Sequence, residues 1–230
     1  MPIYPTRPRR GPYGYILGII TSTKPGEFLP GELQNAESFE FPVLYQAVDG
    51  LDGASAGSAS ADAVIVAAQD LEARGVRALV GADAGLIAFQ REVAKAVRIP
   101  VMLSSLLQLP LIAHVIPAGR TLGVLAVDGE AASRNIAALD LNPAQRALAV
   151  DIVADADEVE DGELRQRMLA AAERLKGQHP DLGCVVLEGG RMCRHARALH
   201  DATGLPIFDS LSMTRYIKTG ANQTAYAGYY

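Results

Sequence analysis

Two turns in the sequence carry an acidic residue beside small residues, where a hydrophobic run ends. They are Gly81-Ala82-Asp83-Ala84-Gly85 and Glu188-Gly189-Gly190-Arg191. A carboxylate in a dry cleft can have its pKa raised towards neutrality and can then donate or accept a proton. Glycine lets backbone N–H groups approach a ligand, and Arg191 can bind a carboxylate through two hydrogen bonds. The turns are therefore candidates for a small-anion site, with Asp83 and Glu188 as proton carriers.

Hydroxyl groups occur at two further turns of the same kind. Thr21 and Ser22 end the first hydrophobic run, and Ser104 and Ser105 follow another. Each hydroxyl can donate to, or accept from, a ligand in a cleft. We therefore include all four as candidate ligand-binding residues.

A structural role is an equally good interpretation of each acidic residue. Asp83 can cap the helix that begins near Leu86, and Glu188 can pair with Arg191 to close an interface. The glycines can simply make tight turns between a strand and a helix. The sequence alone leaves these roles and the catalytic ones open.

The chain contains only two cysteines, Cys184 and Cys193. Cys193 lies near a predicted helix start, where the pKa of a thiol can be lowered. It follows Gly189 by four residues, however, and one helical turn displaces a side chain by about 5 Å, which is far for a reacting group. Cys184 lies within a predicted strand and is expected to pack in the core.

The elements that position these turns alternate between short hydrophobic runs and alanine-rich helical stretches. The alternation predicts an α/β fold with helices flanking a mostly parallel sheet. The predicted strands are Tyr15–Ile20, Phe41–Val48, Ala78–Gly81, Pro100–Leu103, Thr121–Ala126, Leu148–Val153, Cys184–Leu187 and Pro206–Asp209. The predicted helices are Asp62–Arg74, Leu86–Val97, Leu106–Ile116, Glu130–Leu139, Glu163–Lys176, Met192–Thr203 and Leu211–Thr219. Ligands of such sheets bind beyond the carboxyl ends of the strands, where the candidate turns lie.

An internal repeat relates the two halves of the chain. Ala78-Leu-Val-Gly-Ala-Asp-Ala-Gly and Cys184-Val-Val-Leu-Glu-Gly-Gly-Arg lie 106 residues apart, and Ser104 matches Ser210 at the same offset. This period is much longer than the roughly 20–50 residues of a solenoid repeat. We therefore expect two pseudo-symmetric α/β lobes with the site in the cleft between them, although strand–turn–helix units can also look alike by chance.

The expected division of the chain follows from the repeat. Residues 13–117 are predicted to form the first lobe and residues 118–205 the second. The strand and helix of 206–230 are predicted to return to the first lobe before a tail. Residues 1–12 contain several prolines and arginines and are predicted to be a flexible arm.

Composition narrows the class of protein. The net charge of −5 argues against nucleic-acid binding, which needs clustered Lys and Arg. No apolar run approaches the roughly 20 residues that span a membrane, and the basic N-terminal stretch lacks the pattern of a signal peptide. Two cysteines are too few for a disulfide framework, so a cytoplasmic protein is the default expectation.

At these turns the sequence resembles the aspartate/glutamate racemase superfamily, from about Tyr13 to Tyr216. The matching segments are Pro25-Gly-Glu, Asn35-Ala, Phe39-Glu-Phe-Pro-Val, Phe89-Gln-Arg-Glu, Pro100-Val-Met-Leu-Ser-Ser-Leu-Leu-Gln-Leu-Pro and Leu187-Glu. The resemblance implies two facing lobes and an enzyme that needs no cofactor. It also implies a small carboxylate ligand, a reaction at the carbon beside the carboxylate, and a possible homodimer.

The resemblance implies one catalytic cysteine in each lobe, at the positions of Ala84 and Gly189. Neither thiol is present, and Gly190 stands where a threonine or serine commonly follows the second cysteine. Alanine and glycine cannot accept a proton, which argues against two-thiol racemisation. It also argues against a one-thiol decarboxylation that needs the cysteine of the second lobe.

We therefore expect a cofactor-independent isomerase, decarboxylase or hydrolase that acts on a small carboxylate or related carbonyl compound. Asp83 or Glu188 would move protons, and backbone N–H groups at 84–86 and 189–191 would hold developing negative charge. The candidate ligand-binding residues are Thr21, Ser22, Ala84, Gly85, Leu86, Ser104, Ser105, Gly189, Gly190 and Arg191. Two alternatives remain: a catalytically silent small-anion-binding protein, and thiol chemistry moved to Cys193.

Overall fold

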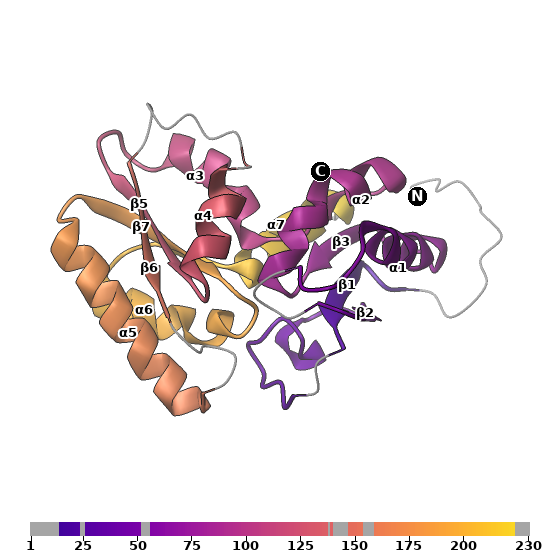
Figure 1. Ribbon diagram of the computed structural model, residues 1–230, viewed down its shortest axis with the longest axis horizontal. Helices are drawn as coiled ribbons and strands as arrows, with labels where there is room; N and C mark the ends of the chain where they lie inside the picture. Colours follow the sequence, from indigo (N-terminus) through magenta and orange to yellow (C-terminus); the bar gives the residue numbers. More distant parts are fainter. Residues whose placement is uncertain are drawn as a thin grey trace, which may run out of the picture.

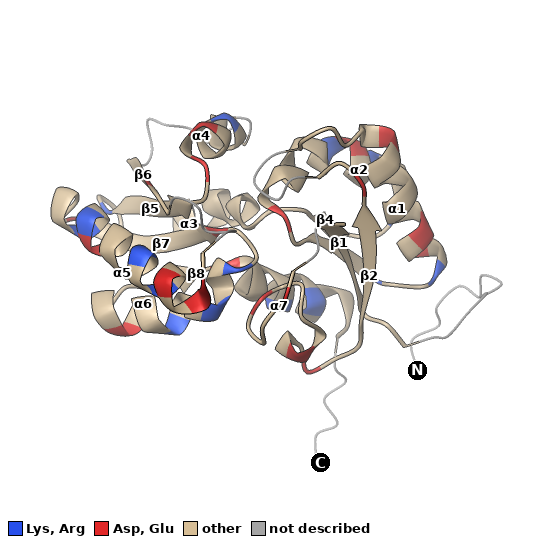
Figure 2. Ribbon diagram, turned by 60° about the horizontal axis from the view of Figure 1, so that its bottom comes forward, with Lys and Arg blue, Asp and Glu red and all other residues tan. Residues whose placement is uncertain are grey.

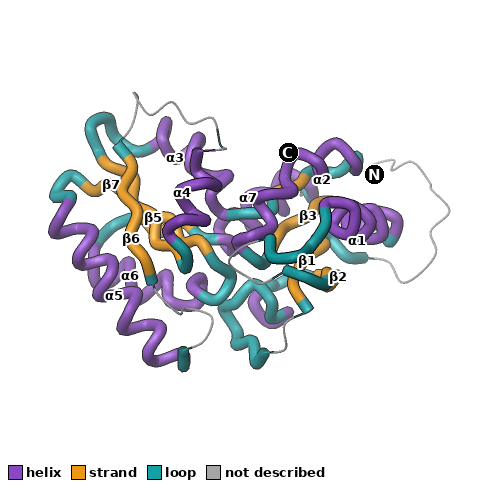
Figure 3. Tube along the Cα trace, viewed as in Figure 1, coloured by secondary structure: helices purple, strands orange, loops and turns teal. Residues whose placement is uncertain are grey.

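The computed structural model describes residues 14–23, 26–51, 56–137, 139, 147–153 and 159–223. It confirms the predicted fold class: two lobes, each a four-stranded parallel sheet flanked by helices (Figure 1). The predicted arm at 1–12 and the end of the chain beyond 223 lie outside the described residues. Figure 3 shows the strands inside each lobe and the helices around them.

The two sheets have the same topology. The first has the strand order β2-β1-β3-β4 and the second has the order β6-β5-β7-β8. The strands of the first sheet are β1 (Leu17–Ser22), β2 (Val43–Val48), β3 (Ala78–Gly81) and β4 (Val101–Met102). Those of the second are β5 (Thr121–Ala126), β6 (Leu148–Ile152), β7 (Leu182–Glu188) and β8 (Ile207–Phe208). Each predicted strand therefore has a counterpart in the structure.

The helices agree with the predicted ones, with a 3-10 turn opening three of them. The α-helices are α1 (Ala61–Ala73), α2 (Gln90–Ala96), α3 (Leu109–Val115), α4 (Gly129–Ala137), α5 (Asp161–Gln178), α6 (Ala196–Thr203) and α7 (Ser210–Ala221). The 3-10 helices are η1 (Ala36–Ser38), η2 (Ala84–Phe89), η3 (Ser105–Gln108) and η4 (Met192–His195). Because η2, η3 and η4 each directly follow a strand end, they bring the candidate turns to the edge where ligands bind.

The internal repeat corresponds to the register of the two sheets. Gly18 of β1 lies beside Leu79 of β3, and Gly123 of β5 lies beside Val185 of β7. The outer strands pair in the same way, since Leu79 lies beside Val101 and Val185 beside Ile207. The offsets of 105 and 106 residues therefore join structurally equivalent positions.

The lobes exchange one helix each. Helix α3 follows the first sheet, but its Leu109 and Ile112 pack with Leu122 of β5. Helix α7 follows the second sheet, but its Met213 and Ile217 pack in the core of the first lobe. Figure 1 shows the same arrangement, with α3 beside β5 and α7 beside β3. Each sheet is thus covered on one face by a helix that the other half of the chain supplies.

The strand and the helix of the C-terminal segment belong to different lobes, whereas both were expected to return to the first lobe. Its strand, β8, pairs with β7 in the second sheet, and only α7 returns to the first lobe. The reason is that the β7–β8 register repeats the β3–β4 register, which keeps the strand with its own half. The apolar side chains of α7 then cover the opposite sheet.

Charged residues of both signs are mixed along the outer helices (Figure 2). This distribution differs from the clustered cations that a nucleic-acid-binding surface presents. In the described part of the chain, no helix is both long and apolar enough to cross a membrane.

Candidate functional site between the lobes

The Asp83 and Glu188 turns lie on one small hollow between the lobes. Asp83 follows the end of β3 and Glu188 ends β7, so the carboxyl ends of two equivalent strands meet there. The hollow has no room for a water molecule in this structure. Sites for small organic ligands usually enclose about 300–1,000 Å³. The lobes must therefore move apart before a ligand can enter the hollow.

Six of the predicted site residues line the hollow: Asp83, Ala84, Ser104, Ser105, Glu188 and Gly189. Seven do not: Thr21, Ser22, Gly85, Leu86, Gly190, Arg191 and Cys193. Gly81, Ala82, Leu103 and Ser210 complete the lining. Among the residues that the structure describes, no group of His, Cys, Asp and Glu is placed to hold a metal ion.

Asp83 is held by the neighbouring strand of its own sheet. Its side chain is buried, and Oδ2 accepts a hydrogen bond from the backbone N–H of Ser22 at 2.7 Å. The Ser22 hydroxyl donates to Oδ1 at 3.1 Å. Asp83 stands at the N-cap of η2, but its side chain makes no capping hydrogen bond. The alternative role of Asp83 as a helix cap is therefore wrong. Ser22 does not line the hollow, but its two hydrogen bonds hold the Asp83 carboxylate in place there.

Glu188 has the strongest chemical signature in the hollow. The residue is 2% exposed, and Nδ2 of Asn135 on α4 donates to its Oε1 at 3.3 Å. Burial raises the pKa of Glu188 to about 7; the Asn135 hydrogen bond opposes the rise, and the charge of Asp128 adds to it. A carboxyl group with this pKa can act as acid or base at neutral pH.

Arg191 does not pair with Glu188 and does not reach the hollow. Its Nε lies 3.7 Å from Oε1 of Glu32, and its Nη2 donates to the carbonyl of Val159 at 3.1 Å. Glu32 is fully buried, and burial raises its pKa. A buried acid needs a nearby cation, which explains why Arg191 turns towards it. The expected Glu188–Arg191 pair is therefore wrong.

The hydroxyls of Ser104 and Ser105 are engaged in holding the structure. Ser104 Oγ caps η3 by accepting from the N–H of Leu106 at 3.2 Å. Ser105 Oγ donates to the carbonyl of Leu187 at 2.7 Å and so joins the two lobes. Both residues line the hollow. With these bonds in place the Ser104 hydroxyl can still donate to a ligand, and the Ser105 hydroxyl can still accept from one.

The two glycines after Glu188 allow the lobes to close on each other. Gly189 has a backbone φ of +141°, a conformation that residues other than glycine rarely adopt. A Cβ at Gly190 would lie 2.7 Å from the carbonyl oxygen of Ala82 and 2.7 Å from Oε1 of Gln34. The Gly190 carbonyl also accepts from the N–H of Leu33 at 3.3 Å. Neither position has room or backbone geometry suited to the larger residues that the resemblance implies there.

Both cysteines are buried, and neither lines the hollow. Cys193 packs in the first-lobe core, and its Sγ donates to the carbonyl of Gly189 at 3.7 Å. Burial raises the pKa of Cys193 to about 12, and burial raises that of Cys184 to about 11. These values favour the neutral thiol, which is a poor nucleophile.

We expect neither cysteine to react with 5,5′-dithiobis(2-nitrobenzoate) in the folded protein at pH 7. Both should react once the chain is unfolded in guanidinium chloride, because the pKa values then return to normal. The absorbance of the released thiolate counts the reactive groups. Rapid modification of the folded protein, lost in Cys193→Ala, would instead restore Cys193 as a candidate reactive group.

Two residues of the site, Ser210 and Asn135, are not among those predicted from the sequence. Ser210 lines the hollow and is the repeat equivalent of Ser104, so the repeat already contained a signal for it. Asn135 contacts Glu188 across 53 residues of sequence. That contact depends on how α4 packs against the second sheet, and no spacing in the sequence indicates it.

Two curated proteins are similar to the chain over much of its length. A dimethylsulfoniopropionate lyase of Durusdinium sp. clade D is 26% identical over 213 residues, covering 80% of this chain and 67% of that protein. Dimethylsulfoniopropionate lyase 5 of Emiliania huxleyi (strain CCMP1516) is 26% identical over 175 residues, covering 66% of this chain but only 35% of that protein. No protein-family model matches the chain.

Solved structures match the whole two-lobed arrangement. Arylmalonate decarboxylase has a TM-score of 0.63 at 15% identity, covering 91% of this chain and 94% of that chain. Glutamate racemase isoform RacE1 from Bacillus anthracis has a TM-score of 0.59 at 14% identity, covering 90% and 82%. Allantoin racemase from Klebsiella pneumoniae has a TM-score of 0.58 at 17% identity, covering 89% and 86%. The chain thus has the fold of the aspartate/glutamate racemase superfamily, as the resemblance at its turns implies.

Proposed function

We propose that the chain is a cofactor-independent enzyme of isomerase or lyase type, acting on a small carboxylate or a related carbonyl compound through Glu188. The observation that carries the proposal is a buried carboxyl group with a pKa of about 7, on the same hollow as Asp83. The racemases and the decarboxylase that share the fold, and the lyases that share sequence, support this class of reaction. Arylmalonate, glutamate and dimethylsulfoniopropionate are all carboxylates.

In this reaction Glu188 would take a proton from the carbon beside the substrate carboxylate. The electron pair of the broken C–H bond then moves onto the carboxylate oxygens. In an isomerase a proton returns to the same carbon; in an elimination the pair forms a double bond as a group leaves the next carbon. Either path needs a base that is partly ionised near neutral pH, which a pKa of about 7 provides.

Backbone donors next to the hollow would stabilise the negative charge. The first N–H groups of a helix have no partner within the helix, and those of Ala84 and Gly85 open η2 beside Asp83. The N–H of Leu86 already donates to the Asp83 carbonyl at 3.2 Å. The proposed donors that line the hollow are therefore the N–H groups of Ala84 in the first lobe and Gly189 in the second.

The test is a proton-transfer assay in D₂O. Dimethylsulfoniopropionate, phenylmalonate, the two glutamate enantiomers and allantoin are incubated separately with the protein, and NMR measures product and deuterium incorporation. We expect turnover or exchange with at least one compound and its loss in Glu188→Gln. Activity that persists in Glu188→Gln would contradict the proposal.

A second candidate function is a catalytically silent small-anion-binding protein. It is favoured by Ala84 and Gly189, the non-reactive residues at the positions where the resemblance implies thiols, and by the burial of both cysteines. This function predicts thermal stabilisation by one of the compounds, without product or exchange after long incubation. The same NMR samples and a melting curve separate the two functions.

Asp83 is expected to support the site rather than carry the proton. In Asp83→Asn the amide can keep both hydrogen bonds with Ser22, so turnover should fall by less than about tenfold. Asp83→Ala leaves the Ser22 donors without a partner and should cost about 1–3 kcal/mol of unfolding free energy. Kinetics and denaturation of both variants test this. A loss in Asp83→Asn as large as that in Glu188→Gln would make Asp83 the second proton carrier.

A further inference from the structure

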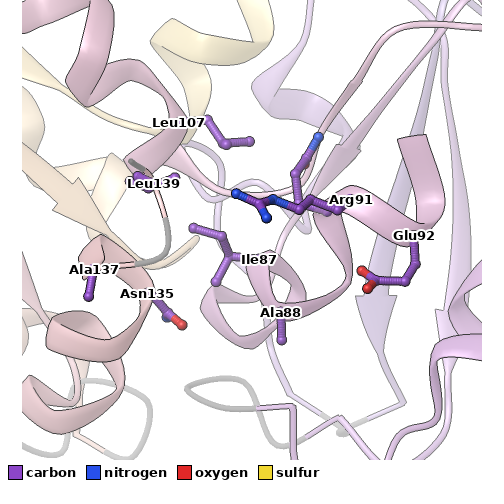
Figure 4. Close-up of a pocket in the computed structure, with 9 residues that line it drawn as sticks. Ile87, Ala88, Arg91, Glu92, Leu107, Asn135, Ala137 and Leu139 are labelled. Carbon is purple, nitrogen blue, oxygen red and sulfur yellow. The ribbon is translucent and has the colours of Figure 1, made fainter. Parts of the chain in front are cut away.

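A larger pocket opens beside the hollow (Figure 4). Its volume is about 620 Å³, which lies within the range of about 300–1,000 Å³ for small-molecule sites. Ile87 and Arg91 line it from the first half of the chain, with Leu107 of η3, while Asn135 and Ala137 of α4 line it from the second half. The pocket therefore lies between the lobes, as the hollow does.

The pocket and the hollow are separate spaces that are lined by neighbouring residues of the same elements. Helix η2 places Ala84 on the hollow and Ile87 on the pocket, and η3 places Ser105 on the hollow and Leu107 on the pocket. The third link is Asn135, which lines the pocket and donates to Glu188 in the hollow. A molecule in the pocket can thus contact Asn135, whose side chain is hydrogen-bonded to Glu188.

Arg91 gives this pocket its chemical character. In Figure 4 its guanidinium extends towards Ile87 and Leu107, and Glu92, which also lines the pocket, has its carboxylate on the opposite side of Arg91. Within the described part of the chain, the Arg91 guanidinium makes no ion pair or hydrogen bond. The neighbouring Gln90 amide is engaged, because it donates to the carbonyl of Val101 at 3.0 Å and accepts from the N–H of Leu103 at 2.9 Å. A guanidinium above an apolar wall suits a carboxylate on an apolar body.

Of the two spaces, the pocket is the one that can hold a ligand in this structure. The hollow has no room for a water molecule, whereas the pocket, at about 620 Å³, accommodates the body of an organic molecule. We propose that the pocket binds an organic carboxylate with an apolar body, the carboxylate on Arg91, the body on Ile87 and Leu107, and the opposite end towards Asn135 and Glu188. The proposal deepens the proposed function, and it rests on that function only in taking Glu188 as the proton carrier.

The test measures binding and requires no turnover. Phenylacetate is titrated into the ¹⁵N-labelled protein and followed by NMR, with phenylacetamide as the uncharged match. We expect shifts at Ile87, Leu107 and the Asn135 side chain, and an affinity for phenylacetate at least about tenfold weaker in Arg91→Gln, because hydrogen bonds to charged groups contribute about 1.5–3 kcal/mol. Phenylacetamide should bind weakly, and equally to both proteins.

Arg98→Gln is the matched control. Arg98 is exposed and lines neither the pocket nor the hollow. Its backbone N–H donates to Glu72, and among the residues that the structure describes its guanidinium has no ion pair or hydrogen bond. The affinity of the Arg98→Gln protein for phenylacetate should stay within about twofold of that of the wild type. Equal affinities in wild type and Arg91→Gln, shifts elsewhere, or no saturable binding at millimolar phenylacetate would each overturn the proposal.

The binding test of the pocket and the activity test of the proposed function can fail independently of each other. Activity retained in Glu188→Gln, together with lost phenylacetate binding in Arg91→Gln, would remove the proposed function and leave the pocket. Activity lost in Glu188→Gln, together with unchanged binding in Arg91→Gln, would remove the pocket alone.

Discussion

Replacing Glu188 by glutamine is expected to abolish most turnover and to stabilise the folded protein at pH 8. Turnover should fall about 10²–10⁴-fold, the usual contribution of a positioned general acid or base. The stability should rise by about 3 kcal/mol, because the buried carboxylate is costly to ionise. The two effects have opposite signs, and a purely structural role of Glu188 would not produce that combination.

The pH dependence follows from the direction of the shift. The pKa of Glu188 is about 7 in the folded protein and has its ordinary value of 4.5 in the unfolded chain. Between these values the folded protein holds a proton that the unfolded chain has released, so stability falls as the pH rises from about 4.5 to about 7. Glutamine removes the ionisation. The gain in unfolding free energy of Glu188→Gln over the wild type should therefore be present at pH 8 and absent at pH 4.

Chemical denaturation of the wild type and Glu188→Gln at the two pH values measures this effect. Glu173→Gln, measured in the same way, serves as a control, since Glu173 is exposed on α5. A Glu188→Gln protein that is less stable at pH 8 would mean that the carboxylate has a stabilising charged partner. The wild-type activity should also change with an apparent pKa near 7.

Replacing Gly190 by alanine is expected to force the lobes apart. The new Cβ would lie 2.7 Å from the Ala82 carbonyl oxygen, which belongs to the backbone of the other lobe and cannot rotate away. Overpacking of this kind costs about 1–3 kcal/mol. It would also separate Asp83 from Glu188, and small misplacements of reacting groups can lower rates about 10²-fold.

Denaturation and kinetics of Gly190→Ala test this prediction together with a control glycine. Gly177 lies in α5, and a Cβ there would meet nothing within 4 Å. Gly177→Ala should leave turnover unchanged and stabilise the protein by up to about 1 kcal/mol, because alanine favours helix. If Gly190→Ala is as stable and as active as the wild type, the lobes do not need this close contact.

Much of the fold was predictable because its signals are local. Short hydrophobic runs such as Cys184–Leu187 predict buried strands, and the matched turns at the two offsets predict equivalent lobes. The meeting of Asp83 and Glu188 followed from those two facts, since the carboxyl ends of equivalent strands face one cleft. No contact between distant residues had to be known.

The partners of the site residues were not predictable, because they depend on burial across the chain. Arg191 turns to Glu32, whose carboxylate attracts a cation strongly only once its own side chain is fully buried. Likewise, Asn135 reaches Glu188 only because α4 packs against the second sheet. Nothing in a short stretch of sequence distinguishes Glu32 from an exposed acid.

The exchange of α3 and α7 between the lobes has a bearing on how such a chain can arise. Each half carries a final helix that covers the sheet of the other half, so a single half would leave one face of its own sheet open to water. An ancestral chain of half this length would therefore have required a second copy of itself, with the two copies trading helices. In the present chain the two halves are covalently joined, and Asp83 and Glu188 meet at the boundary between them.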